Sequence, residues 1–180
     1  NILPNYITKK NFLFIHIPKC AGTSFSHALY NRQIGHMSLE DYFLIDKNFT
    51  QNVFKFTICR HPLERLISAY HFLKNGGINK KDLSFSKKYL SDCNSFEDFV
   101  LHQLSRKEVL SYYHFRPQSE YISYKGIIRV DKVYKLESIN NNIHEISKAI
   151  GIEIILNKLN ENKKKRIENI NYEMLKIITK

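Results

Sequence analysis

The sequence FLFIHIPKCAGTSFSHALY, which spans residues 12–30, contains in immediate succession the signals for a strand, a loop and a helix. Its first six residues are a mainly apolar run that stops at Pro18, as expected of a short buried strand. Small and polar residues follow, and Thr23 or Ser24 can cap a helix that continues to the end of the segment. A strand that leads through a loop into a helix is the building unit of α/β folds.

Two further strands are predicted along the chain, each followed by a helix. Residues 53–59 read as a strand, and Pro62 suits the first turn of a helix that ends at the Asn-Gly-Gly of residues 75–77. Residues 130–136 read as a strand that leads into an amphipathic helix closed by Gly151. Strands that alternate with helices predict a mainly parallel sheet with right-handed crossovers.

The other segments predict helices within the same domain. Residues 80–113 read as irregular and helical, with a capped helix start at Ser95, and residues 163–178 read as a last helix. The length of the chain fits one domain. We therefore predict a single α/β domain over residues 1–180, with a parallel sheet of about four or five strands and helices on both faces.

The chain carries a large positive charge. Lys and Arg outnumber Asp and Glu by 28 to 17, which gives a formal net charge of +11. A surplus of this size favours anionic partners such as nucleotides, polyanionic glycans, nucleic acids or acidic membrane surfaces, although a solvated lysine-rich surface explains it at least as well. Nucleic-acid modules also interleave aromatic and basic residues in recognisable motifs. Because the sequence has no such motif, we expect no nucleic-acid partner.

The cysteines and the apolar segments bear on the compartment. Cys20, Cys59 and Cys93 have the spacing of neither a disulfide framework nor a zinc site, which favours a reducing compartment and no metal. No window reaches the roughly 18 apolar residues of a membrane span, and no signal peptide opens the chain. We therefore expect a protein of the bacterial cytoplasm, or of the Golgi lumen if a membrane anchor has been trimmed from the sequence. No pattern indicates an oligomeric state.

The loop of residues 18–24 has the features of an anion-binding turn. Backbone N–H groups converge where a strand passes into a helix, and the helix dipole adds partial positive charge. Small side chains at Ala21 and Gly22 allow a close approach, and Lys19 supplies a full charge. The alternative is an ordinary turn capped by Thr23. A nucleoside-triphosphate loop is disfavoured, because there the lysine follows the last glycine and here it precedes the glycine.

A second motif, RHPLERLISAY, occupies residues 60–70. Arg60 ends a predicted strand at the carboxyl edge of the sheet, where ligands of open α/β sheets bind. Ser68 lies two helical turns further on, so the two side chains can grip one phosphate together. The alternative is that Arg60 and Arg65 pair with carboxylates such as Glu64, and that Ser68 is a small packing residue.

Taken together, FIHIPKCAGTS at residues 14–24 and RHPLERLISAY at residues 60–70 resemble the carbohydrate sulfotransferases that use 3′-phosphoadenosine-5′-phosphosulfate (PAPS). The resemblance is closest to the heparan/uronyl 2-O-sulfotransferase-like group and its bacterial relatives. It continues more weakly through residues 114–118, residues 133–137 and the region of Asn160. It implies a three-layer fold like that of the P-loop NTPases.

The resemblance also implies roles for the residues of both motifs. Arg60 and Ser68 would hold the 3′-phosphate of PAPS, and the first motif would hold its 5′-phosphosulfate. A carbohydrate hydroxyl would attack sulfur in line, and 3′-phosphoadenosine-5′-phosphate (PAP) would leave while Lys19 and the loop amides neutralise its charge. This chemistry needs no metal. The predicted donor-binding residues of the first motif are Lys19, Cys20, Ala21, Gly22, Thr23 and Ser24.

A histidine is the expected general base, because an imidazole titrates near neutral pH. His36 is our first choice, since GHMS at residues 35–38 resembles the segment that carries the base in the 2-O-sulfotransferase-like group. His114 is the second choice, and Arg116 and Gln118 beside it are candidates for binding the acceptor. Of the other histidines, His61 is expected to support the phosphate loop, His16 to lie in the core, and His27, His71, His102 and His144 to fall on helices.

Two other functions stay open at this point. Cys20 could be the low-pKa nucleophile of a phosphatase, although that signature needs an arginine six positions later, where the chain has Ser26. The chain could instead be a non-catalytic basic module that captures anionic glycans. The basic residues 163–166 could reach a polyanionic acceptor or cover the nucleotide, or they could be the solvated start of a helix.

Overall fold

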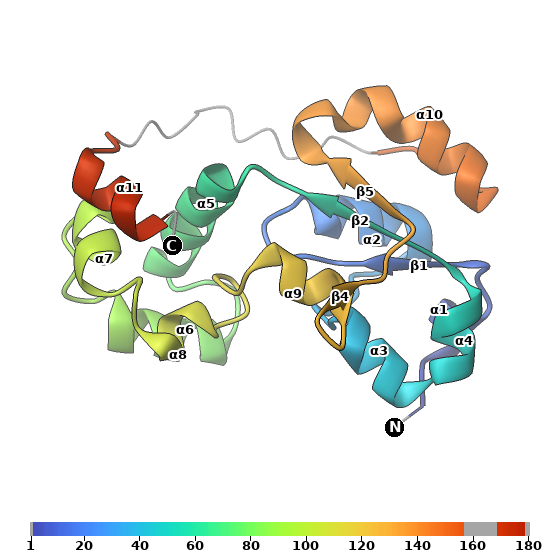
Figure 1. Ribbon diagram of the computed structural model, residues 1–180, viewed down its shortest axis with the longest axis horizontal. Coiled ribbons are helices and arrows are strands. Elements are labelled where there is room, and N and C mark those ends of the chain that lie inside the picture. The colour runs from blue at the N-terminus through green and yellow to red at the C-terminus, as the bar shows by residue number, and fades with distance from the viewer. Residues whose placement is uncertain (1, 157–168, 179–180) are drawn as a thin grey trace. The chain divides into compact units, whose positions relative to one another are not determined.

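The chain divides into two structural units in this computed structural model, which describes residues 2–156 and 169–178 (Figure 1). Each unit has a hydrophobic core of its own. The chain passes from the first unit to the second within the RHPLERLISAY motif. Unit 1 consists of Asn1–His61 and Pro117–Glu161, and unit 2 consists of Pro62–Arg116 and Asn162–Lys180.

Unit 1 is centred on a three-stranded sheet in the order β1-β2-β5, flanked by helices (Figure 1). β1 (Phe12–Ile15) pairs with β2 (Phe54–Cys59), and β2 pairs with β5 (Lys132–Lys135); both pairings are parallel. In this register Ile15 lies opposite Thr57. The strands lie where the apolar runs predict them, and their parallel pairing confirms the predicted α/β class.

The sheet has fewer strands than the sequence predicts. Among the described residues it contains three strands, and the other two, β3 (Ser123–Tyr124) and β4 (Ile127–Ile128), form a separate antiparallel hairpin. Lys125 and Gly126 between them have positive φ angles of 51° and 75°. This backbone twist is typical of a two-residue hairpin turn, and it directs β3 and β4 to pair with each other.

Polar side chains begin two helices of unit 1, and a glycine ends a third. Ser38 and Asp41 form a reciprocal capping box at the start of α3. The Asp46 carboxylate accepts the N–H of Phe49 at the start of α4. Gly151, with a φ of 70°, closes α10 as predicted. The described helices of unit 1 are α1 (Asn5–Thr8), α2 (Gly22–Tyr30), α3 (Leu39–Ile45), α4 (Lys47–Asn52), α9 (Gln118–Ile122) and α10 (Ile139–Ile150), which follows the 3₁₀-helix η1 (Leu136–Ser138).

Aromatic side chains form the centre of the core of unit 1. All four residues of β1 are buried. The ring of Phe14 lies 5.3 Å from that of Phe56 on β2 and 5.9 Å from that of Phe25 on α2, measured between centroids. A parallel strand is covered on both faces, which explains why β1 is a continuous apolar run and not an alternating one.

Side-chain hydrogen bonds fix the three strands. The hydroxyl of Thr57 on β2 donates to a carbonyl oxygen of β1 at 2.7 Å. The carboxylate of Asp131, just before β5, accepts the backbone N–H of Lys55 at 2.6 Å and lies 3.1 Å from its ammonium nitrogen. On the other side of β1, the N–H of Phe14 donates to the hydroxyl of Tyr30 at 3.0 Å. These contacts satisfy buried polar groups that the short strands leave without ladder partners.

Unit 2 is helical. Pro62 occupies the first position of α5, as predicted, and Gly76 and Gly77 follow its end with φ angles of 88° and 66°. The side chain of Ser95 accepts the N–H of Asp98 and caps α7, which confirms the predicted helix start. The described helices of unit 2 are α5 (Pro62–Lys74), α6 (Lys80–Tyr89), α7 (Phe96–His102), α8 (Lys107–Leu110) and α11 (Tyr172–Ile178).

The end of the chain is described in part. α11 falls within the predicted last helix, residues 163–178, and begins at Tyr172. The basic residues 163–166 and the region of Asn160 lie outside the described residues. In the described part of the chain no helix combines the length and the apolar character that crossing a bilayer requires.

Replacing Tyr30 by Phe removes the hydroxyl that accepts the N–H of Phe14. Both residues are buried, so this N–H would lose its partner without gaining water. We expect the free energy of unfolding to fall by about 1–3 kcal/mol, measured by urea unfolding. Tyr172→Phe is the matched control, because the side chain of Tyr172 is 71 % exposed. An equal loss in both variants would contradict the structural role of this hydrogen bond.

Candidate functional site

The two sequence motifs leave the same edge of the sheet in unit 1. β1 and β2 are parallel neighbours, and Ile15 and Thr57 lie opposite each other near their carboxyl ends. The loop that carries Lys19 follows β1, and Arg60 follows β2 directly. Carboxyl ends of parallel strands at one edge are where α/β sheets bind their ligands. Lys19 and Arg60 are both partly exposed there.

The loop after β1 has an unusual backbone. Lys19 and Ala21 have positive φ angles of 67° and 57°, whereas Cys20 between them does not. Non-glycine residues rarely adopt this left-handed conformation, and alternation of hand turns successive N–H groups toward a common point. Such a concave set of N–H groups binds anions. The backbone therefore supports the anion-binding character that the sequence predicts for this loop.

The start of α2 differs from our prediction. Ala21 is the N-cap residue, and its methyl side chain cannot accept a hydrogen bond. Thr23 and Ser24, which we expected to cap the helix, lie inside its first turn instead. Thr23 is exposed and Ser24 is partly exposed. The left-handed conformation of Ala21 directs the chain into the helix without a polar cap, so the first N–H groups of α2 receive no N-cap side chain.

Gly22 is required by a close contact. A Cβ atom at this position would lie 1.8 Å from Cδ2 and 2.1 Å from Nε2 of His16. Neither distance is possible between real atoms, and His16 is buried with only 3 % of its surface exposed. The imidazole of His16 therefore packs directly on the backbone of the loop. This confirms that His16 belongs to the core, and it adds a contact that the sequence did not predict.

His16 also holds the segment that carries His36. Nδ1 of His16 lies 3.3 Å from the carbonyl oxygen of Ile34, and Nδ1 of His36 lies 3.1 Å from the carbonyl oxygen of His16. The two rings are 4.2 Å apart between centroids. A carbonyl oxygen only accepts hydrogen bonds, so Nδ1 carries the proton in both rings and Nε2 of neutral His36 has the lone pair. Through His16, the structure brings His36 to the loop at Gly22.

Gln118 links the two motifs. Its side-chain oxygen accepts the backbone N–H of Arg60 at 3.0 Å and the thiol of Cys20 at 3.4 Å. Its amide nitrogen donates to the carbonyl oxygen of Arg60 at 2.8 Å. A contact of Gln118 with the acceptor stays a prediction, and the structure adds that its side-chain amide bonds to residues of both motifs. Gln118 lies 58 residues from Arg60 and 98 from Cys20, so no local spacing indicates this role.

The neighbourhood of Cys20 suits a thiol. Cys20 is buried, and its sulfur donates to the carbonyl oxygen of Pro18 at 3.7 Å as well as to Gln118. Both partners are oxygen acceptors that would repel the negative charge of a thiolate. This arrangement disfavours the phosphatase alternative, in which Cys20 is an ionised nucleophile.

One more contact orders the end of β2. The backbone N–H of His61 donates to the carboxylate of Glu137 in η1 at 2.6 Å. The side chain of His61 is exposed. The contact joins the residue after Arg60 to the element that follows β5, so η1 and α9 both help to hold the start of the second motif.

Ser68, His114 and Arg116 belong to unit 2. Ser68 is partly exposed on α5. The carbonyl oxygen of Arg116 accepts a hydrogen bond at 3.0 Å from the buried guanidinium of Arg65. This contact fastens the end of the segment Pro62–Arg116 to α5.

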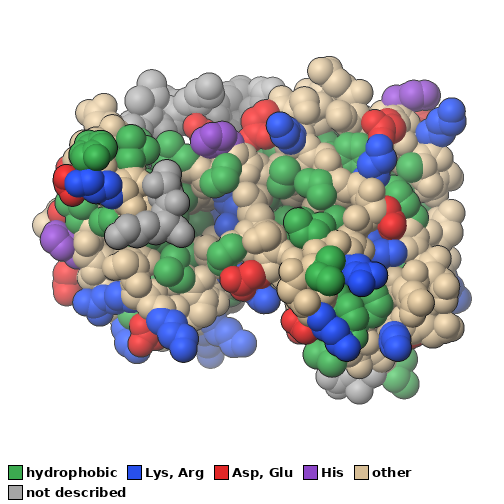
Figure 2. Space-filling view, in the orientation of Figure 1, with side chains coloured by type: hydrophobic (Ala, Val, Ile, Leu, Met, Phe, Trp, Pro, Cys, Tyr) green, Lys and Arg blue, Asp and Glu red, His purple; other side chains and the backbone are tan. Residues whose placement is uncertain are grey.

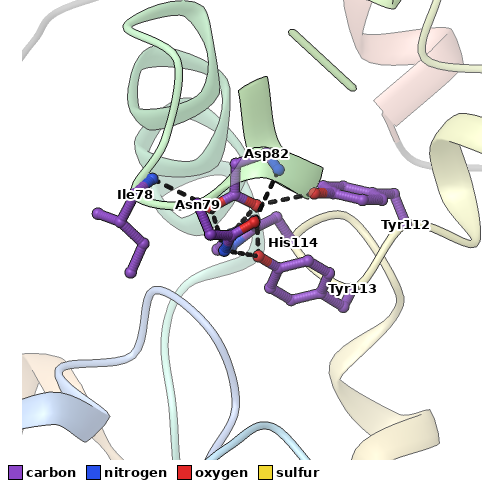
Figure 3. Close-up of polar contacts among 6 residues, drawn as sticks. All are labelled: Ile78, Asn79, Asp82, Tyr112, Tyr113 and His114. Carbon is purple, nitrogen blue, oxygen red and sulfur yellow. Dashed lines mark hydrogen bonds and ion pairs between the residues drawn. The ribbon is translucent and has the colours of Figure 1, made fainter. Parts of the chain in front are cut away.

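A fully buried carboxylate, Asp82, organises unit 2 around His114 (Figure 3). Nε2 of His114 lies 3.5 Å from the Asp82 carboxylate, and His114 is only 4 % exposed. Asp82 also accepts hydrogen bonds from the hydroxyls of Tyr112 (2.7 Å) and Tyr113, the amide of Asn79 (2.9 Å) and the N–H of Ile78 (3.2 Å). His114 thus lies in a packed polar cluster, whereas His36 is half-buried.

Hydrogen bonding determines the ionisation of Asp82. Burial alone would raise the pKa of this carboxyl, but the hydrogen bonds from Tyr113, Tyr112 and Ile78 and the nearby His114 outweigh burial and hold the pKa below its usual value. The carboxylate is therefore charged at neutral pH. In the described part of the chain, the cluster around Asp82 included, no group of three or more His, Cys, Asp or Glu side chains could hold a metal ion.

Comparison with known proteins relates the chain to a family. A model of the sulfotransferase family matches residues 5–175, a range that includes both motifs and parts of both units. No curated protein and no solved structure matches the chain.

We expect Asp82→Asn to destabilise the protein in a pH-dependent manner. Because the pKa of Asp82 is lower in the folded protein than in the unfolded chain, its charge stabilises the fold above a pH of about 4 and ceases to do so as the pH falls through the folded pKa. Urea unfolding should show a deficit of about 1–3 kcal/mol at pH 7 that narrows in acid. The control is Asp92→Asn at an exposed carboxylate. A deficit that does not change with pH would contradict the role of the charge.

Proposed function

Because the chain belongs to the sulfotransferase family, we propose that it transfers the sulfonate group of PAPS to a hydroxyl of a carbohydrate acceptor. The observation that carries this proposal is the loop of residues 19–22 at the carboxyl end of β1. Its alternating backbone, its lysine and the uncapped start of α2 form a site suited to a phosphosulfate. Gln118 ties this loop to Arg60, so both proposed ends of the donor site share one support.

The donor would be held at its two charged ends. Lys19, the N–H groups of the loop and the hydroxyls of Thr23 and Ser24 would face the 5′-phosphosulfate. Arg60, together with Ser68 of the second motif, would hold the 3′-phosphate. Arg60 is suited to this because a guanidinium binds phosphate through two parallel hydrogen bonds.

The reaction would be an in-line displacement at sulfur. The acceptor oxygen forms a bond to sulfur as the bond between sulfur and the bridging oxygen of PAPS breaks, and PAP leaves. Negative charge develops on the bridging oxygen, where Lys19 and the loop amides stabilise it without reorganising. The proton of the acceptor hydroxyl passes to a base. These groups supply the charge that the reaction needs, so no metal enters the proposed mechanism.

His36 is the proposed base. Its Nδ1 lies 3.1 Å from the carbonyl oxygen of His16, and with the proton on Nδ1 the other ring nitrogen, Nε2, is the basic atom of the neutral imidazole. His36 is half-buried and lies beside His16, the residue that packs on Gly22. His114, the second candidate, is enclosed with Asp82, which makes it less suited to accept a proton from a sugar.

A carbohydrate acceptor, on a glycan or a glycolipid, is supported by the resemblance of residues 35–38 to the 2-O-sulfotransferase-like group and by the net charge of +11. Arg116 stays a candidate for contacting acceptor carboxylates or hydroxyls. A non-catalytic basic module that captures anionic glycans is the remaining alternative. Such a module would bind glycans in a salt-sensitive manner, and PAP would not compete.

We expect Lys19→Ala to lower sulfotransfer from labelled PAPS by about 10²–10³-fold, because the variant loses the charge that stabilises the leaving oxygen. Transfer to a panel of glycan acceptors measures this effect. Lys9→Ala is the matched control, since it removes the same charge at an exposed position outside the motif. Unchanged activity in Lys19→Ala would exclude the proposed mechanism.

Calorimetric titration with PAP tests binding at the proposed donor site independently of sulfonate transfer. The wild type should bind PAP, and salt-sensitive glycan binding without PAP binding would support the basic module instead. Cys20→Ser should retain activity, because the proposed mechanism uses no thiolate.

We expect His36→Ala to lower kcat by about 10²–10⁴-fold while the Kd for PAP stays within about twofold of the wild-type value, because a general base acts on the acceptor and not on the donor. Steady-state kinetics and calorimetry on the same preparations measure both. His27→Ala, at an exposed position on α2, is the control. If kcat does not change in His36→Ala, the base must be sought elsewhere, with His114 as the next candidate.

A further inference from the structure

The β3–β4 hairpin of unit 1 exposes two consecutive isoleucines. Ile127 and Ile128 are 57 % and 56 % exposed. Side chains of consecutive strand residues point to opposite faces, so neither face of β4 is covered. Large aliphatic side chains in this unit are otherwise mostly buried in its core. An uncovered pair at one site is typical of a surface that binds an apolar partner.

The hairpin is held in place by its strand pairing and by a contact with α3. Ser123 pairs with Ile128 and Tyr124 pairs with Ile127 across the two strands. The ring of Tyr124 stacks on that of Phe43 from α3, with centroids 4.1 Å apart and planes inclined by 19°. Leu44, next to Phe43 in sequence, is 78 % exposed and adds a third aliphatic side chain on the neighbouring helix.

Basic residues flank the isoleucines. Lys125 in the turn and Arg129 after β4 are both exposed. The ammonium of Lys125 lies 5.5 Å from the ring centroid of Tyr124. The next carboxylate in sequence, Asp131, is already paired with Lys55. Figure 2 shows hydrophobic and basic side chains together around the hairpin and α3, with acidic side chains beside them.

We propose that this hairpin patch, which we define as Lys125, Ile127, Ile128 and Arg129, binds the surface of an anionic lipid bilayer. The isoleucines would enter the boundary between headgroups and acyl chains, and Lys125 and Arg129 would contact the lipid phosphates. Aliphatic side chains bordered by Lys, Arg and Tyr are the composition of interfacial membrane anchors. Charge favours this partner over a second copy of the chain, since two such patches would bring like charges together. The inference does not depend on the proposed sulfotransfer.

The test is co-sedimentation of the full chain with lipid vesicles. We expect binding to vesicles of phosphatidylcholine that contain about one third phosphatidylglycerol, weak binding to pure phosphatidylcholine, and loss of binding as salt is raised. Lys125→Ala with Arg129→Ala should lower the partition coefficient roughly twentyfold, and Ile127→Ser with Ile128→Ser should lower it at least tenfold.

Matched controls remove an exposed isoleucine and exposed positive charges outside the hairpin patch. Ile78→Ser acts on an isoleucine that is 73 % exposed in unit 2, and Lys80→Ala with Lys81→Ala removes two exposed charges. These variants should bind vesicles like the wild type. Urea unfolding of every variant shows that the fold is intact, and Lys19→Ala should bind vesicles normally, which separates this inference from the proposed enzyme activity.

Three results would overturn the proposal. They are equal binding to both vesicle types, wild-type binding by the two patch variants, or the absence of vesicle binding together with a concentration-dependent dimer that Ile127→Ser with Ile128→Ser dissociates. The last result, measured by analytical ultracentrifugation, would assign the patch to contacts between copies of the chain.

Discussion

The arrangement of the site depends on the amide of one side chain, Gln118. Its oxygen and nitrogen make both possible backbone hydrogen bonds to Arg60, and the same oxygen receives the thiol of Cys20. β1 and β2 each end in a loop, and loops at a sheet edge have no ladder to hold them in register. A planar amide, with one acceptor oxygen and two N–H donors, can hold two loops in a fixed relative geometry. Without it, the loop of Cys20 and the backbone of Arg60 would lose the hydrogen bonds that they share through this side chain.

The sequence predicted the regular elements well, for physical reasons that can be named. The apolar runs at residues 12–17, 53–59 and 130–136 became strands because a parallel sheet buries both faces of each strand. Pro62 and Gly151 marked a helix start and a helix end through backbone restrictions that hold in any context. Signals that rest on one residue's own conformational limits are therefore the reliable ones.

Features that depend on distant contacts were not predictable in this way. We expected Thr23 to cap α2, but the N-cap residue is Ala21 in a left-handed conformation. Alanine rarely adopts this conformation, so its intrinsic preference does not predict it. The packing of His16 on Gly22 needs a fold in which strand and helix start touch. The self-paired hairpin at Lys125 and Gly126 was missed because lysine is an uncommon residue for the first turn position. In each case tertiary structure selects a local conformation that the local sequence does not favour.

The backbone at Lys19 places chemistry and conformational preference in conflict. With a φ of 67°, this position would suit glycine or asparagine, and a lysine there costs about 1 kcal/mol or more. Neither easier residue carries a positive charge. Glycine or asparagine at this position would therefore relieve the backbone but remove the positive charge that the proposed donor site uses. The proposed role of Lys19 would therefore set a limit on how stable this loop can become.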